Sequence, residues 1–62
     1  MKTKAHNTKL LRKKLAELHI HMYEIAQFMD MFGDEETQKH GLELLGASKI
    51  CKEWAEHAKA RV

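Results

Sequence analysis

Proline is absent from this 62-residue chain, and cysteine occurs once, at Cys51. Because proline interrupts helices, its absence favours long uninterrupted helices. A lone cysteine excludes an internal disulfide, and a free thiol is typical of a reducing compartment, so we expect a cytoplasmic protein. No run of about 18 apolar residues occurs, and the basic start leads into amphipathic sequence. The sequence therefore predicts neither a membrane span nor a signal peptide.

Motifs for catalysis and metal binding are also missing. The chain has no Gly-rich phosphate loop and no nucleophile elbow, and the places one helical turn from Cys51 hold Ala47 and Ala55 rather than histidine. Five histidines are present, but His19 and His21 are two residues apart, so their side chains diverge on a helix. We therefore expect no enzymatic activity, no metal site and no cofactor.

Apolar residues between positions 11 and 32 recur at alternating spacings of four and three. This predicted seam consists of Leu11, Leu15, Leu18, Met22, Ile25, Met29 and Phe32. A repeat of 3.5 residues predicts one long helix with a narrow apolar face. We expect this helix to cover about 8–32, with Asn7 or Thr8 as its N-cap.

A short turn follows the first predicted helix. Gly33 is suited to the left-handed position that closes a helix. Asp34 is the predicted N-cap of a second helix, and Glu35 and Glu36 suit its first turn. Because Gly33 and Asp34 alone form the turn, the second helix, about 35–60, is predicted to lie antiparallel to the first.

The second predicted helix carries a seam of smaller residues. Its members are Leu44, Ala47, Cys51, Trp54 and Ala58. With Gly41, Gly46 and Ser48 nearby, this helix permits close approach of the bulky first seam. The predicted fold class is therefore all-α, with one αα-hairpin domain over residues 1–62.

Several large apolar residues remain outside the packing that one hairpin provides. These candidate interface residues are Ile20, Phe28, Met31, Leu42, Leu45, Ile50 and Trp54. A chain this short rarely gains more than roughly 3–5 kcal/mol from its own core. We therefore expect a homo-oligomer, most simply a dimeric four-helix bundle, that covers these residues.

Charge is distributed unevenly despite a net charge of only +2. Residues 1–14 contain six lysines and arginines and no acid, whereas residues 30–36 contain four acids and no base. In an antiparallel hairpin, Lys59 and Arg61 return beside the basic start. Antiparallel docking of two such rods would neutralise their ends, whereas parallel or ring docking would gather the cations.

The basic end suggests a ligand class. Lysine and arginine near a helix N-terminus suit phosphate. The candidate ligand-binding residues are Lys9, Arg12, Lys13, Lys14 and Arg61. The alternative interpretation is a solvated charge run without a ligand. Acids at positions 17 and 24 interrupt any basic helix face, so we do not expect sequence-specific DNA recognition.

Two family resemblances add to this interpretation. The layout of two similar helices and a short acidic turn resembles the Rop-type plasmid RNA-binding hairpin, whose dimer is a four-helix bundle. This resemblance implies RNA binding on a helix face. The run 47–58 resembles the closing helix of small phage anti-defence sponges through Trp54, Ala55 and Ala58 of a Trp-Ala-x-x-Ala pattern. Those sponges are helical oligomers, and this resemblance implies sequestration of a cyclic nucleotide signal.

The sequence as a whole predicts a non-enzymatic, oligomeric binding protein. The leading hypothesis is a phage-type anti-defence protein that sequesters a phosphate-bearing nucleotide through the basic cluster. One alternative is a Rop-like RNA-binding four-helix-bundle dimer. Another is a protein–protein adaptor or inhibitor that applies an apolar helix face to a host protein.

Overall fold

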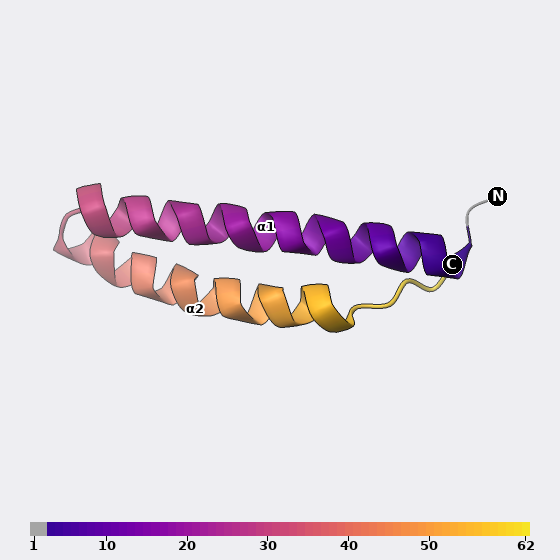
Figure 1. Ribbon diagram of the computed structural model, residues 1–62. Coiled ribbons are helices and arrows are strands. Elements are labelled where there is room, and N and C mark those ends of the chain that lie inside the picture. Colours follow the sequence, from indigo (N-terminus) through magenta and orange to yellow (C-terminus); the bar gives the residue numbers. More distant parts are fainter. Residues whose placement is uncertain (1–2) are drawn as a thin grey trace.

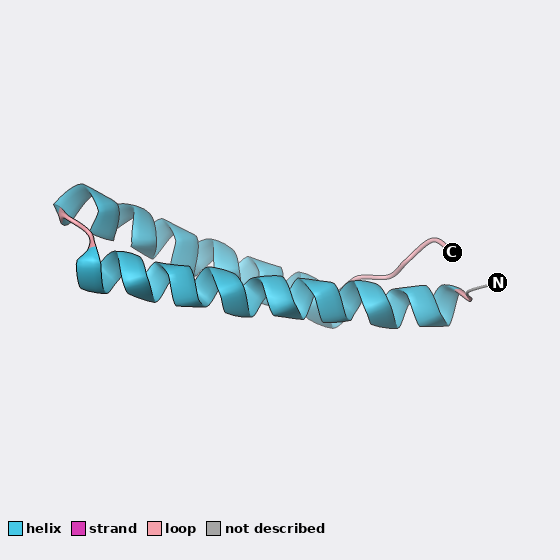
Figure 2. Ribbon diagram, turned by 90° about the horizontal axis from the view of Figure 1, so that it is seen from above, coloured by secondary structure: helices cyan, strands magenta, loops and turns pink. Residues whose placement is uncertain are grey.

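The computed structural model describes residues 3–62, which form two helices packed side by side in a rod of 49 × 14 × 12 Å (Figure 1). Helix α1 spans Lys4–Phe32 and helix α2 spans Glu35–His57. The helices are antiparallel and cross at a shallow angle (Figure 2). The predicted all-α hairpin is therefore confirmed. Neither helix combines the length and apolar character needed to cross a membrane.

Helix α1 begins one turn earlier than predicted. Its N-cap is Thr3, whose Oγ1 accepts a 3.1 Å hydrogen bond from the backbone N–H of His6. The prediction of Asn7 or Thr8 as the cap was wrong, because both side chains bind the C-terminal residues of the chain instead. The longer helix brings Lys4 into its first turn, whereas Lys2 of the basic cluster lies outside the described residues.

The turn between the helices is tighter than the sequence suggests. Gly33 has φ −80° and ψ 156°, which is extended backbone, so the predicted left-handed conformation was wrong. Glycine is needed here for its size, because a Cβ would clash with the Met29 carbonyl and the Thr37 side chain. The predicted N-cap of α2 is confirmed: the Asp34 carboxylate accepts a 2.9 Å hydrogen bond from the Thr37 backbone N–H.

The packed face of α1 includes only three of the seven residues of the predicted seam. The residues of α1 and its cap that are buried or half-buried in a heptad pattern are Thr8, Arg12, Leu15, His19, Met22, Ala26, Met29 and Gly33. Four members of the predicted seam (Leu11, Leu18, Ile25 and Phe32) are instead 37% to 73% exposed. Their assignment to the hairpin interior was therefore wrong.

The packed face of α1 differs from the predicted seam because α2 presents small residues to α1. Its packed positions are Thr37, Gly41, Leu44, Ser48, Cys51, Ala55 and, at its C-cap, Ala58. A Cβ added to Gly41 would lie 3.1 Å from Met29 Cβ and 3.3 Å from the Ala26 carbonyl oxygen. Such close approach favours the small Ala26 at the contact line over the bulky Ile25.

Two predicted members of the α2 seam behave differently. Cys51 is 1% exposed, and its Sγ donates to the Leu15 carbonyl oxygen at 3.5 Å, so it is a buried packing residue as predicted. Trp54 is 58% exposed, which contradicts its placement in the seam. Gly46 also has no close neighbour, so its expected role in helix approach was wrong.

The interior of the described hairpin contains no large side chain that is fully buried. The buried residues are Ala26, Gly41, Ser48 and Cys51. Because hydrophobic stabilisation scales with the apolar area removed from water, these four residues contribute little. Two contacts set the register of α1 against α2. Gly41 lies against Met29, and His19 Nδ1 lies 2.8 Å from the Ser48 carbonyl oxygen.

Candidate functional site at the basic end

The residues after α2 continue in the direction of that helix and pass beside the first turns of α1 (Figure 1). Helix α2 ends at His57 rather than near residue 60, because side chains of α1 satisfy the backbone of the following segment. Arg12 Nε donates a 2.7 Å hydrogen bond to the Ala58 carbonyl oxygen, and Thr8 Oγ1 accepts one of 3.0 Å from the Ala60 N–H. We call residues 58–62 the C-terminal strap.

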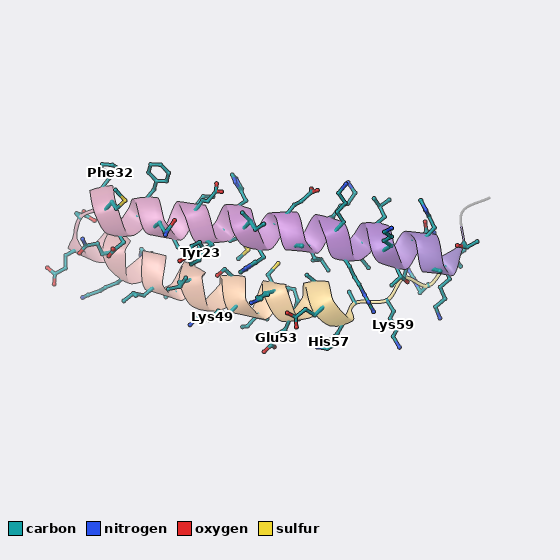
Figure 3. The ribbon with its side chains drawn as sticks, viewed as in Figure 1. Tyr23, Phe32, Lys49, Glu53, His57 and Lys59 are labelled. Carbon is teal, nitrogen blue, oxygen red and sulfur yellow. The ribbon has the colours of Figure 1, made fainter. Side chains whose placement is uncertain are left out.

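The strap and α1 line a shallow hollow of about 670 Å³ that is largely open to solvent. This basic hollow is lined by Lys4, Ala5, Thr8, Lys9, Arg12 and Lys59. Lys59 projects from the strap in Figure 3. The described residues 3–16 and 57–62 contain no aspartate or glutamate, and the salt bridges of the described chain all involve histidine rather than lysine or arginine. No lysine or arginine of the hollow is therefore paired in a salt bridge with a carboxylate of the described chain.

The hollow contains only part of the predicted ligand-binding set. Lys9 and Arg12 line it, whereas Lys13 and Lys14 are exposed on α1 outside its lining, and Arg61 is exposed in the strap. The sequence-based set missed Lys4, Thr8 and Lys59. The sequence could have predicted Lys59 as a ligand-binding residue, because an antiparallel hairpin must return its C-terminal cations to the basic start. Lys4 was missed because the helix was expected to begin near residue 8.

The chemistry of this lining is anion binding. Lysine ammonium groups, the arginine guanidinium and the Thr8 hydroxyl supply hydrogen-bond donors that suit phosphate or carboxylate oxygens. Arg12 uses its Nε on the strap, which fixes the guanidinium at the edge of the hollow. The lining residues include no histidine, cysteine or carboxylate that could act as a general base.

The opposite end of the rod is acidic. The pKa of Asp34 lies below its ordinary value because its carboxylate accepts hydrogen bonds from the backbone and side chain of Thr37. His40 Nδ1 lies 2.9 Å from a carboxylate oxygen of Glu43 on the exposed surface. Within residues 3–62, no three histidine, cysteine or acidic side chains meet in a metal-binding arrangement.

A second candidate site is an apolar stripe on one broad side of the hairpin. Each residue in it directly precedes a packed position of its helix, and in an antiparallel pair such residues share one side. This apolar face consists of Leu11, Leu18, Ile25, Phe28 and Phe32 of α1 and Ala47, Ile50 and Trp54 of α2. Phe28 and Phe32 stack with ring centroids 5.7 Å apart, and Figure 3 shows Phe32 projecting from the end of α1.

The candidate interface residues divide between two sides of the rod. Phe28, Ile50 and Trp54 belong to the apolar face. Ile20, Leu42 and Leu45 directly follow packed positions, so they lie on the opposite broad side. There Leu42 and Leu45 line a hollow of about 200 Å³ with Tyr23. Met31 is exposed on the outer edge of α1, so a single flat contact cannot cover the whole predicted set.

Comparison with known proteins adds no family. The chain matches no protein-family model, no curated protein and no solved structure. The Rop-type and sponge resemblances therefore stay predictions.

Proposed function

We propose that this protein is a non-enzymatic, homo-oligomeric binding protein that captures a phosphate-bearing nucleotide in its basic hollow. The observation that carries the proposal is the convergence of Lys4, Lys9, Arg12 and Lys59 around one hollow, with no acid in the adjoining segments. Three of these residues come from the first turns of α1, and Lys59 comes from the strap. The fold thus collects cations that are far apart in sequence.

The size and charge of the hollow suit such a ligand. Its volume of about 670 Å³ falls within the range of roughly 300–1,000 Å³ that is typical of small-molecule sites. Hydrogen bonds to charged groups contribute about 1.5–3 kcal/mol each. A ligand with two phosphates offers more acceptor oxygens to Lys9, Arg12 and Lys59 than a single carboxylate does.

The resemblance of 47–58 to phage anti-defence sponges supports the choice of nucleotide. It implies a helical oligomer that removes a cyclic nucleotide signal from solution. A sequestering protein must bind its nucleotide tightly and be abundant, but it catalyses no reaction on it. This agrees with a lining that offers hydrogen-bond donors and no general base. We therefore propose a phage-type sequestering protein as the specific form of this function.

Oligomerisation is part of the proposal. The hairpin buries no large side chain in the described residues, and a core made of Ala26, Gly41, Ser48 and Cys51 is small for an independent fold. The simplest assembly is a dimer in which two hairpins form a four-helix bundle.

The test is a calorimetric titration with two probes, a cyclic dinucleotide and a single-stranded RNA oligomer. The double variant Lys9→Glu and Lys59→Glu reverses charge inside the hollow. The matched control, Lys39→Glu and Lys49→Glu, makes the same change in net charge on exposed residues outside it.

The proposal expects saturable cyclic-dinucleotide binding that the hollow variant loses and the control keeps. Tighter RNA binding, falling log-linearly with salt, would instead support the Rop-like alternative. Failure of both probes to bind, or equal binding by both variants, would contradict the proposed site.

A protein–protein adaptor is the second candidate, and one observation favours it. Ile20, Tyr23 and Leu42 are exposed on the side opposite the apolar face, so a dimer that covers that face leaves them in solvent. Exposed apolar groups that persist in an assembly are typical of a partner site. An adaptor would bind neither probe and would lose its protein partner on the change Ile20→Lys.

A further inference from the structure

We infer that a second copy of this chain covers the apolar face, and that the two rods dock antiparallel with α1 stacked on α1. The inference deepens the proposed homo-oligomer and is independent of the phosphate ligand. The amino-acid pattern alone specifies neither which broad side of the rod is covered nor whether the two rods dock parallel or antiparallel.

The exposed area of the hairpin requires such a partner. The chain exposes 5170 Å², whereas a folded monomer of 7.2 kDa exposes about 4,100 Å² by the usual scaling with mass. The difference is about 1,000 Å². A standard protein–protein interface removes about 800 Å² from each partner. Covering one broad side of the rod is therefore enough to bring the surface to an ordinary value.

The apolar residues of α1 are spaced almost symmetrically along the helix on either side of His21, so the same residues of two antiparallel copies can meet. His21 is exposed on the same side as the apolar face, because it directly precedes the packed Met22. Leu18 and Ile25 lie about one helical turn on either side of His21, and Leu11 and Phe32 lie about three turns away. A two-fold axis at His21 therefore stacks Leu18 on Ile25 of the other copy and Leu11 on Phe32.

Parallel docking on the same face would pair apolar residues with charged ones. It stacks α1 of one copy on α2 of the other at the same level along the rod. The hairpin register places Glu43 level with Ile25, and Glu36 level with Phe32. The parallel arrangement would therefore press these two carboxylates of each copy against apolar side chains, whereas the antiparallel arrangement about His21 presses only Glu43 against one, Ile50 of the other copy. A carboxylate held against apolar groups is unfavourable unless it finds a partner, so the antiparallel arrangement costs less.

Charge complementarity favours the same orientation. On the side of the apolar face, Lys14 lies toward the basic end, and Glu36 and Glu43 lie toward the turn. Antiparallel docking brings the acids of each copy to the basic end of the other. Parallel docking would place like charges together at both ends, which is repulsive.

This arrangement leaves the basic hollow open. Lys9 and Lys59 directly follow the packed positions Thr8 and Ala58, so they lie on the side away from the apolar face. An antiparallel dimer therefore carries two separate hollows at opposite ends, and each remains accessible to a ligand.

The first experiment compares two isoleucine variants by sedimentation equilibrium and circular dichroism. Ile25 on the apolar face is 40% exposed, and Ile20 on the opposite side is 55% exposed, so neither is needed inside one hairpin. We expect Ile25→Lys to abolish the dimer or to unfold the chain, and Ile20→Lys to remain a folded dimer. A wild-type monomer, or equal effects of both variants, would overturn the inference.

The second experiment tests orientation with spin labels attached at Glu35→Cys, in a background with Cys51→Ser. Glu35 lies at the turn end of the rod. Antiparallel docking about His21 separates the two labels by about 35–40 Å, from the rise per residue of a helix. Parallel docking holds them within about 20 Å. Short distances in a dimer would overturn the orientation while leaving the proposed oligomer and its ligand site intact.

Discussion

Arg12 and Ala58 are joined across the hairpin by a 2.7 Å hydrogen bond from the guanidinium Nε to the backbone carbonyl oxygen. This bond marks the point where α2 stops and the strap begins. Without it, the carbonyl would need water or a further helical turn as its partner. One basic side chain therefore contributes both to the end of the fold and to the wall of the hollow.

Removing this side chain should loosen the strap. We expect Arg12→Ala to lower the free energy of unfolding by about 1–2 kcal/mol, because a hydrogen bond from a charged donor to a part-buried carbonyl is lost. Amide hydrogen exchange should accelerate at Ala60, which donates to Thr8. The control is Lys13→Ala, an exposed neighbour that should leave both quantities unchanged. Equal exchange in the two variants would show that Arg12 does not hold the strap.

The two helical glycines of α2 should respond in opposite ways to alanine. Gly46 has no neighbour for a Cβ within 4 Å, so Gly46→Ala should raise the free energy of unfolding by about 0.8–1.0 kcal/mol through helix propensity alone. At Gly41 the same Cβ would lie 3.1 Å from Met29 Cβ, and overpacking costs about 1–3 kcal/mol. We therefore expect Gly41→Ala to be destabilising.

Chemical denaturation of this matched pair tests the close approach of the helices. The gain at Gly46 calibrates the intrinsic effect of alanine in α2. Stabilisation of similar size by both changes would mean that the helices do not meet at Gly41.

Acid should weaken the cap of α2. The pKa of Asp34 is lowered in the folded chain by hydrogen bonds from Thr37. A lowered pKa contributes stability that is complete above the unfolded value, near 3.9, and is lost as the pH falls through the folded value. We expect the melting temperature of the native protein to fall in this acidic window. Asp34→Asn keeps a capping oxygen that does not titrate, so its melting temperature should fall less over the same window.

Burial of Cys51 predicts slow thiol chemistry. Its side chain is 1% exposed between the helices, and reagent can reach it only when the helices separate. Alkylation by an excess of thiol reagent should therefore be much slower in the native protein than in denaturant. Equal rates would place the thiol on the surface and contradict the packed face of α2.

The fold was predictable because its signals are local. Missing proline, the 3.5-residue repeat and the Gly33-Asp34 turn each point to two long helices, and the cap at Asp34 follows from its side-chain chemistry. The phase of the first seam was not predictable. Its residues form two adjacent stripes, and the sequence alone does not say which stripe meets α2.

The structure resolves this ambiguity through small residues of α2. Gly41, Ser48 and Ala55 form their own heptad, and their close approach selects Ala26 rather than Ile25 for the contact line. The lining of the basic hollow was only partly predictable for a related reason. Lys59 and Thr8 meet there only because α2 stops at His57 and the strap continues in extended form past the first turns of α1.

We propose that a single hairpin leaves an apolar face that a second copy covers. Sedimentation equilibrium of the unmodified chain, from low to high micromolar concentration, tests it most directly. We predict a folded species of twice the 7.2 kDa chain mass that dissociates and loses helicity together on dilution. A 7.2 kDa species that stays helical and melts cooperatively at low micromolar concentration would show that one hairpin folds without a second copy.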